Sequence, residues 1–233
     1  MASNQVAGRG NLGVLTGTLF VLLWIVATVL DSGGSYPRPT DNMEKVQAFF
    51  KSYSSGAGTN AGVLILSAVV LLWFAGYLAS FLRREGRPGS GPSLVLAAGG
   101  VASATMLLSG GATMSLTGSD VVSDAAVTQA LYQLSFWAGG PLHVAALGTM
   151  IAAAASALGG VLSKWLNVFG IVVGVLGILA SLTAVVPLAI MFTPIGRFLG
   201  FLWILIATIM ISVRRPSATS TAGLPSALDH SST

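Results

Sequence analysis

The chain alternates long apolar stretches with short polar connections. Six stretches are long enough to cross a bilayer, whose hydrocarbon core needs roughly 20 residues of helix. They cover Leu12–Leu30, Ala61–Leu82, Ser93–Leu116, Leu134–Leu158, Trp165–Ile190 and Ile195–Val213. None shows the two-residue alternation of a membrane β-strand, so every stretch predicts a helix. We therefore expect an all-α fold, a polytopic bundle of six transmembrane helices over residues 12–213.

Outside the apolar stretches, one connection predicts a further element. Residues 41–53 place Met43, Val46 and Phe50 on one face of a short amphipathic helix in the first outer loop, with Asp41 as its cap. Ser54–Gly58 predicts the end of that helix. Residues 1–11 form a short N-terminal segment, and residues 214–233, rich in Ser, Thr, Ala and Pro, predict a disordered tail.

Composition and charge predict the location and the orientation. Charged residues make up 8% of the chain and the mean hydropathy is +0.83, whereas soluble domains contain about 25% charged residues. If the N-terminus is cytoplasmic, seven of the 11 basic residues fall on the cytoplasmic side and four outside. That bias predicts both termini in the cytoplasm of a multi-pass plasma-membrane protein. It also accounts for the net charge of +4 without a nucleic-acid partner. The excess of Arg over Lys and the richness in Ala and Gly favour a bacterial source.

Small residues recur along several of the predicted spans. The stripes comprise Gly13 and Gly17; Gly148, Ala152, Ser156 and Gly160; and Gly170, Gly174, Gly177 and Ser181. Such residues allow membrane helices to approach closely. Because a six-span chain has many internal interfaces, we expect these stripes to form contacts within the chain.

Reactive side chains are almost absent from the predicted spans. The chain has no cysteine, and none of the six stretches contains Asp or Glu. The motifs of intramembrane proteases are missing, and a single histidine in the spans cannot supply paired haem ligands. We therefore predict no catalytic, cofactor-binding or metal-binding residues, no cofactor, and no enzymatic activity.

The candidate site is a polar pocket of four residues, His143, Pro141, Gly140 and Trp137. Pro141 cannot donate a hydrogen bond to the carbonyl of Trp137, so the helix should kink there. Ionisable residues inside a membrane are often functional. The alternative is a neutral His143 bonded to Thr105, Ser109 or Thr113 of the third span, holding the bundle together. Arg197, at the edge of the last span, is expected to extend outward to the membrane surface.

The chain resembles a large family of bacterial six-span membrane proteins. The resemblance rests on Leu72-Trp73-Phe74 followed by Arg83-Arg84-Glu85-Gly86, and on the run from Leu162 to Gly170. It covers most of residues 46–213, although Ser163 stands where many members have proline. The family is a domain of unknown function, so the resemblance implies a fold but neither an activity nor site residues.

Three functions remain open. The first is a non-enzymatic structural, regulatory or partner-binding role in the membrane. The second is passive transport or channel activity for a small solute, and the third is an intramembrane enzyme or redox protein. The expected partners are the lipid bilayer and either a membrane-protein partner or further copies of the chain.

Overall fold

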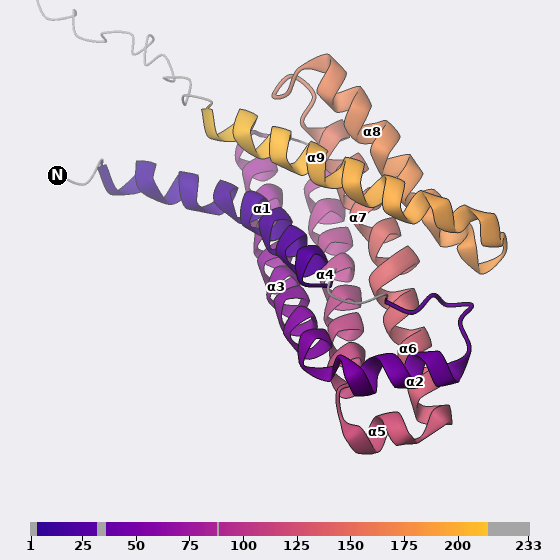
Figure 1. Ribbon diagram of the computed structural model, residues 1–233. Coiled ribbons are helices and arrows are strands. Elements are labelled where there is room, and N and C mark those ends of the chain that lie inside the picture. The colour runs from indigo at the N-terminus through magenta and orange to yellow at the C-terminus, as the bar shows by residue number, and fades with distance from the viewer. Residues whose placement is uncertain (1–3, 32–35, 88, 214–233) are drawn as a thin grey trace, which may run out of the picture.

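The computed structural model describes residues 4–31, 36–87 and 89–213, and every regular element in them is helical (Figure 1). The elements are α1 (Asn4–Asp31), α2 (Met43–Ser52), α3 (Ser54–Arg84), α4 (Gly91–Ser115), α5 (Ser119–Ser123), α6 (Ala125–Trp137), the π-helical segment η1 (Ala138–Leu142), α7 (His143–Ala157), α8 (Lys164–Leu179), the 3-10 segments η2 (Ala180–Ala184) and η3 (Pro187–Met191), and α9 (Phe192–Val213). The all-α prediction is confirmed. The predicted tail, residues 214–233, lies outside the described residues.

Five helical stretches are long and apolar enough to cross a membrane. They are Ser54–Arg84, Gly91–Ser115, Ala125–Ala157, Lys164–Ala184 and Pro187–Val213. In α1 the apolar part, Leu15–Leu30, is shorter, although the helix itself runs for 28 residues and extends beyond the predicted span to Asn4. The chain is therefore a multi-pass helical membrane bundle.

The helices surround one large apolar core. α3 packs between α1 and α4, and α7 packs between α4 and α8. α9 contacts α1, α7 and α8, and in Figure 1 it crosses obliquely in front of α4 and α7. Phe20, Leu71, Met150 and Trp203 are fully buried in this core. The indole N–H of Trp203 donates to the carbonyl of Leu166 at 3.0 Å, so the largest core side chain has no unpaired polar atom.

Four glycines, which we call the glycine seam, lie where α7, α8 and α9 meet: Gly148, Gly174, Gly177 and Gly196. A Cβ atom added at Gly148 would lie 2.6 Å from the carbonyl oxygen of Gly174, and one at Gly196 would lie 2.8 Å from the Cα of Gly177. Both neighbours are backbone atoms, so only glycine permits this approach. The predicted role of the small-residue stripes as contacts within the chain is confirmed for Gly148, Gly174 and Gly177.

A second, smaller apolar cluster lies at the end of the bundle that holds α2 and α5 (Figure 1). Val46, Phe50, Ala57, Leu116, Val122 and Tyr132 are its buried members. The Gln47 amide donates to the carbonyl of Val122 at 2.7 Å, which ties α2 to α5. We call this part of the molecule the cap. The opposite end, which holds the α3–α4 and α7–α8 turns, is the turn end.

The amphipathic helix is present and ends at Ser52, next to the predicted Tyr53, but its predicted cap is wrong, and so is the prediction that Ser54–Gly58 is not helical. Asn42 caps α2, because its side-chain oxygen accepts from the Lys45 amide at 3.0 Å. The Asp41 carboxylate instead accepts from the Arg38 amide at 2.7 Å. Ser54–Gly58 does not end the helical region, since α3 begins at Ser54, directly after Tyr53. These small residues form the first turn of α3, and the apolar run that follows them continues the same helix.

Candidate functional site: a cavity beneath the cap

The helix that contains α6 and α7 is interrupted by η1, and the interruption alters its hydrogen bonds. Pro141 has no N–H, and Gly140 has non-helical angles (φ −94°, ψ −107°). The His143 N–H bonds to the carbonyl of Ala138, five residues back, as in a π-helix. In a regular helix that N–H would bond to Gly139. The kink predicted at Pro141 is confirmed, and it deprives the Gly139 carbonyl of its usual donor.

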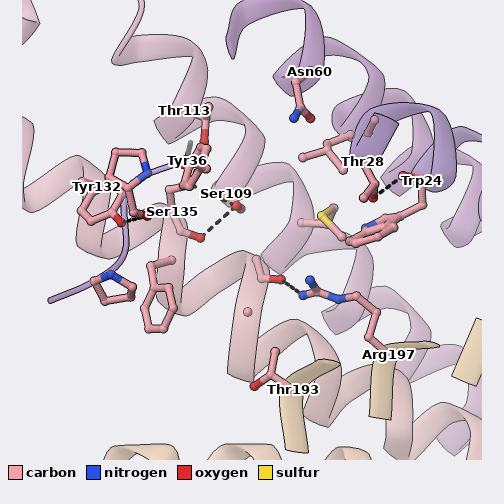
Figure 2. A pocket seen from close by; sticks show the side chains of 18 of the residues that line it. Trp24, Thr28, Tyr36, Asn60, Ser109, Thr113, Tyr132, Ser135, Thr193 and Arg197 are labelled. Atoms are coloured by element: carbon pink, nitrogen blue, oxygen red, sulfur yellow. Dashed lines mark hydrogen bonds between the residues drawn. The ribbon is translucent and has the colours of Figure 1, made fainter. Parts of the chain in front are cut away.

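Arg197, in α9, supplies the donor for this carbonyl. Its Nη2 atom donates to the Gly139 oxygen, and its Cζ atom lies 4.9 Å from the centre of the Trp24 ring. In Figure 2 the Arg197 side chain extends from α9 toward the Trp24 ring, and the dashed line marks its hydrogen bond. The prediction that Arg197 extends outward is wrong. Gly196 faces the glycine seam, and this fixes the rotation of α9 so that position 197 turns toward η1 and α1.

The Arg197 charge has no acidic partner in the described part of the chain. Among residues 4–31, 36–87 and 89–213, the only salt bridge joins Lys45 to Asp41, at 2.9 Å and in the cap. A guanidinium remains protonated at any physiological pH. A cation that is partly removed from water and unpaired is costly, so this side chain carries charge that the protein itself does not neutralise.

The guanidinium lies in a cavity of about 410 Å³ between the bundle and the cap. Walls come from α1, α3, α4, α6, η1 and α9, and the segment Tyr36–Pro39 covers it. The lining residues are Trp24, Ala27, Thr28, Tyr36, Pro37, Arg38, Pro39, Asn60, Leu64, Met106, Ser109, Thr113, Tyr132, Ser135, Phe136, Gly139, Gly140, Thr193 and Arg197. Ligand pockets in proteins commonly measure about 300–1,000 Å³, so the cavity is large enough for a small molecule.

Four buried polar atoms in the cavity lining lack hydrogen-bond partners within the described residues. They are Trp24 Nε1, Asn60 Oδ1, Thr193 Oγ1 and Arg197 Nε. Asn60 and Thr193 are each only 9% exposed. A buried polar group without a partner costs about 1–3 kcal/mol, and the great majority of such groups in proteins are paired. Four such atoms thus belong to residues that line one cavity.

Other polar side chains in the lining are paired and hold the walls together. The Ser109 hydroxyl donates to the carbonyl of Ser135 at 2.9 Å, and the Thr113 and Ser135 hydroxyls lie 2.7 Å apart. These contacts join α4 to α6. The Tyr132 hydroxyl donates to the carbonyl of Pro37 at 2.6 Å, which fastens Tyr36–Pro39, the segment we call the strap, to α6.

The predicted site residues are only partly brought together. Gly140 lines the cavity, whereas Trp137 packs against Phe136, and Pro141 is buried outside the lining. His143 is fully buried, and its Nδ1 atom lies 2.9 Å from the carbonyl of Ala102. A carbonyl can only accept, so Nδ1 carries the proton and donates. Nε2 has no partner among the described residues.

The predicted hydroxyl partners of His143 are wrong. Ser109 and Thr113 bond to Ser135, and the Thr105 hydroxyl donates to carbonyls of its own helix. Sequence reasoning also missed Arg197 as a site residue. The sequence did contain a signal for it, because Arg197 is the only Lys or Arg in any of the six predicted spans.

The cavity is closed on the side that faces the turn end. Leu64 lies one turn below Asn60 on α3, and Met106 lies about one turn below Ser109 on α4; both line the floor. Below them the core residues Leu71 and Leu147 are fully buried. No three His, Asp or Glu side chains come together in the portion of the chain described, and the lining contains no acid.

No model of a known protein family matches the chain, and neither a curated protein nor a solved structure is similar to it.

Proposed function

We propose that this chain is a non-enzymatic membrane protein that binds a small molecule in the cavity beneath its cap. The observation that carries the proposal is the set of four unpaired buried polar atoms around one space of about 410 Å³. Nine buried polar atoms are unpaired among the described residues, and the four that belong to the lining, an arginine and a tryptophan nitrogen among them, are grouped around one space. Solute binding, the second function that the sequence left open, is therefore favoured over a purely structural role.

The lining residues support binding rather than catalysis. Arg197 cannot exchange a proton at neutral pH, and the Ser109, Thr113 and Ser135 hydroxyls bond to one another or to a carbonyl. His143 is not among the lining residues. No base is thus placed to activate a nucleophile. The closed floor favours a receptor, or a carrier that must rearrange to release its solute, over an open channel.

We further propose six spans with both termini in the cytoplasm of a bacterial plasma membrane. The Lys/Arg distribution supports this orientation. α1 supports the sixth span, because Phe20 and Val21 are buried in the common core. In this orientation the cap and the cavity face the outside, so the ligand would enter from there. Membership of the bacterial six-span family stays a prediction.

Native mass spectrometry of the gently purified full chain tests ligand binding. The unaltered protein should retain a small molecule of defined mass. Ala27→Leu adds bulk to a buried position in the lining and should abolish retention. The control is Gly111→Leu, because Gly111 is exposed and a Cβ there would meet no atom within 4 Å. Equal retention by both variants, or none by the unaltered protein, would contradict the proposal.

Cysteine labelling tests the orientation, because the chain has no cysteine of its own. Ser55→Cys and Gly118→Cys lie at exposed positions of the cap end, and Ser90→Cys lies at an exposed position of the turn end. A membrane-impermeant thiol reagent applied to intact cells should label the first two and leave the third unlabelled. The reverse pattern would invert the topology.

A further inference from the structure

We propose that the ligand is a small organic anion whose carboxylate or phosphate group binds Arg197. This inference rests on the proposed function, since it specifies the ligand class of the same cavity. Its basis is the charge of the lining, the chemistry of the unpaired atoms and the apolar character of the remaining walls.

The cavity is positively charged. Two lining residues, Arg38 and Arg197, are cations, and no lining residue is an acid. The nearest acid along the chain, Asp41, is bound to the Arg38 amide and to Lys45. The net positive charge of the lining therefore favours binding of an anion and disfavours binding of a cation. Since a guanidinium in low-dielectric surroundings interacts strongly with an opposite charge, an anion gains most from this site.

Three of the four unpaired atoms belong to groups that can donate a hydrogen bond. Arg197 Nε and Trp24 Nε1 each carry a hydrogen and can only donate, and the Thr193 hydroxyl can also donate. The bond from Nη2 to the Gly139 carbonyl and the cation–π contact with Trp24 hold the guanidinium in place. An oxyanion has several lone pairs that can accept from such donors, and its bonds with a guanidinium are strong and directional.

The rest of the lining is apolar and sets the shape of the ligand. Ala27, Leu64, Met106 and Phe136 supply walls without hydrogen-bonding groups. A volume of about 410 Å³ suits an anionic head with a short aliphatic or aromatic body. Two sources offer this chemistry: a water-soluble carboxylate or phosphate ester, and the head of an anionic lipid whose acyl chains stay in the bilayer.

A matched pair of probes tests the charge requirement without altering the protein. The full chain is placed in nanodiscs of zwitterionic phosphatidylcholine and titrated at pH 7 with 4-bromobenzoate or with neutral 4-bromobenzamide. Bromine quenches indole fluorescence at short range, so binding quenches the emission of Trp24, and Trp24→Phe identifies that component. We expect bromobenzoate to bind about tenfold or more tightly than bromobenzamide, as charge-assisted hydrogen bonds predict.

Substitutions at Arg197 assign the effect to one side chain. Arg197→Gln should abolish the preference for bromobenzoate, and Arg197→Lys should retain part of it, because a lysine keeps the charge but loses the planar donor fork. Arg84→Gln is the matched control, since Arg84 also lies over an aromatic ring, 5.9 Å from the centre of Tyr77 at the turn end. If Arg197→Gln fails to fold, the comparison of bromobenzoate with bromobenzamide on the unaltered chain still tests whether the cavity prefers an anion.

The outcomes separate this inference from the proposed function. Equal binding of both probes, or of neither, overturns the anion inference. The retention experiment with Ala27→Leu then shows independently whether the cavity holds a neutral molecule instead. Nanodiscs that contain phosphatidylglycerol distinguish the two sources. Loss of bromobenzoate binding there, through competition, supports the inference and identifies a lipid head, whereas unchanged binding supports it and identifies a soluble anion.

Discussion

Two neighbouring residues of α9, Gly196 and Arg197, belong to opposite kinds of environment. Gly196 lies in the glycine seam, where a Cβ atom would come within 2.8 Å of the Gly177 Cα. Arg197 lies in a cavity of about 410 Å³ and leaves its Nε atom unpaired. At the seam α7, α8 and α9 are in backbone contact, whereas the cavity is walled by α1, α3, α4, α6, η1 and α9.

The difference shows how the bundle makes room for a charged side chain. Gly148 and Gly196 bring α7 and α9 onto α8, which fixes the rotation of α9 and thereby the direction of Arg197. Pro141 and Gly140 then interrupt the facing helix, so that the Gly139 carbonyl becomes available to Arg197. Closely packed residues contribute to stability, whereas the unpaired atoms of the cavity reduce it. A local loss of stability of this kind is common at functional sites.

The largest expected effect is at the seam. Gly148→Ala should destabilise the protein by about 1–3 kcal/mol, because the new Cβ would meet backbone atoms that cannot move without shifting α8. Unfolding of the purified protein in mixed detergent micelles measures the change. Gly100→Ala is the control, since a Cβ there meets no atom within 4 Å. If both variants unfold alike, the seam does not hold the bundle together.

A smaller effect is expected from the cavity wall. Ser135→Ala should cost about 1–2 kcal/mol, because it removes the partner of the Thr113 hydroxyl in a buried setting. The same unfolding measurement applies. Ser156→Ala serves as the comparison, since that exposed hydroxyl bonds only within its own helix. A loss as large as that of Gly148→Ala would mean that the cavity wall is as important to stability as the seam.

The strap should respond more weakly still. Tyr132→Phe removes the hydrogen bond to the Pro37 carbonyl and should lower the stability by about 1 kcal/mol. Amide hydrogen exchange at Arg38 should become faster, because the strap loses its attachment to α6. Tyr77→Phe, at the turn end, should leave that exchange unchanged. Unaltered exchange in Tyr132→Phe would show that the strap is held by its other contacts.

The smallest effect concerns pH at the edge of the cap. The hydrogen bond from the Arg38 amide, followed by the bond to Lys45, holds the pKa of Asp41 below its ordinary value. A lowered folded-state pKa contributes stability above the unfolded pKa of about 4, and this contribution disappears as the pH falls through the folded pKa.

Asp41→Asn should therefore remove the acid-induced rise in hydrogen exchange at Arg38 and Lys45, after correction for the intrinsic pH dependence of exchange. The exposed acid Glu44 provides the control as Glu44→Gln. An acid-induced rise that persists in Asp41→Asn would assign it to another group.

The sequence by itself determined the apolar helices and several of the positions at which they approach one another closely. Runs such as Ala61–Leu82 contain no charge, and only helices satisfy the backbone of such runs in a bilayer. The stripe around Gly148 and Gly174 predicted close approach because glycine lacks a side chain. The kink at Pro141 followed from the missing N–H. Each of these inferences depends on local chemistry, which neighbours in the sequence specify.

Only the tertiary structure decided which polar groups meet. Arg197 and Gly139 are separated by 58 residues, and His143 and Ala102 by 41. Their pairing depends on the rotation of α9 and on the register of α4 against α7, which arise from the sum of many side-chain contacts. The residues next to Arg197 in the sequence do not specify whether its side chain faces the lipid or the cavity. Its inward direction followed from the close contact of Gly196 with α8, a property of the assembled helices.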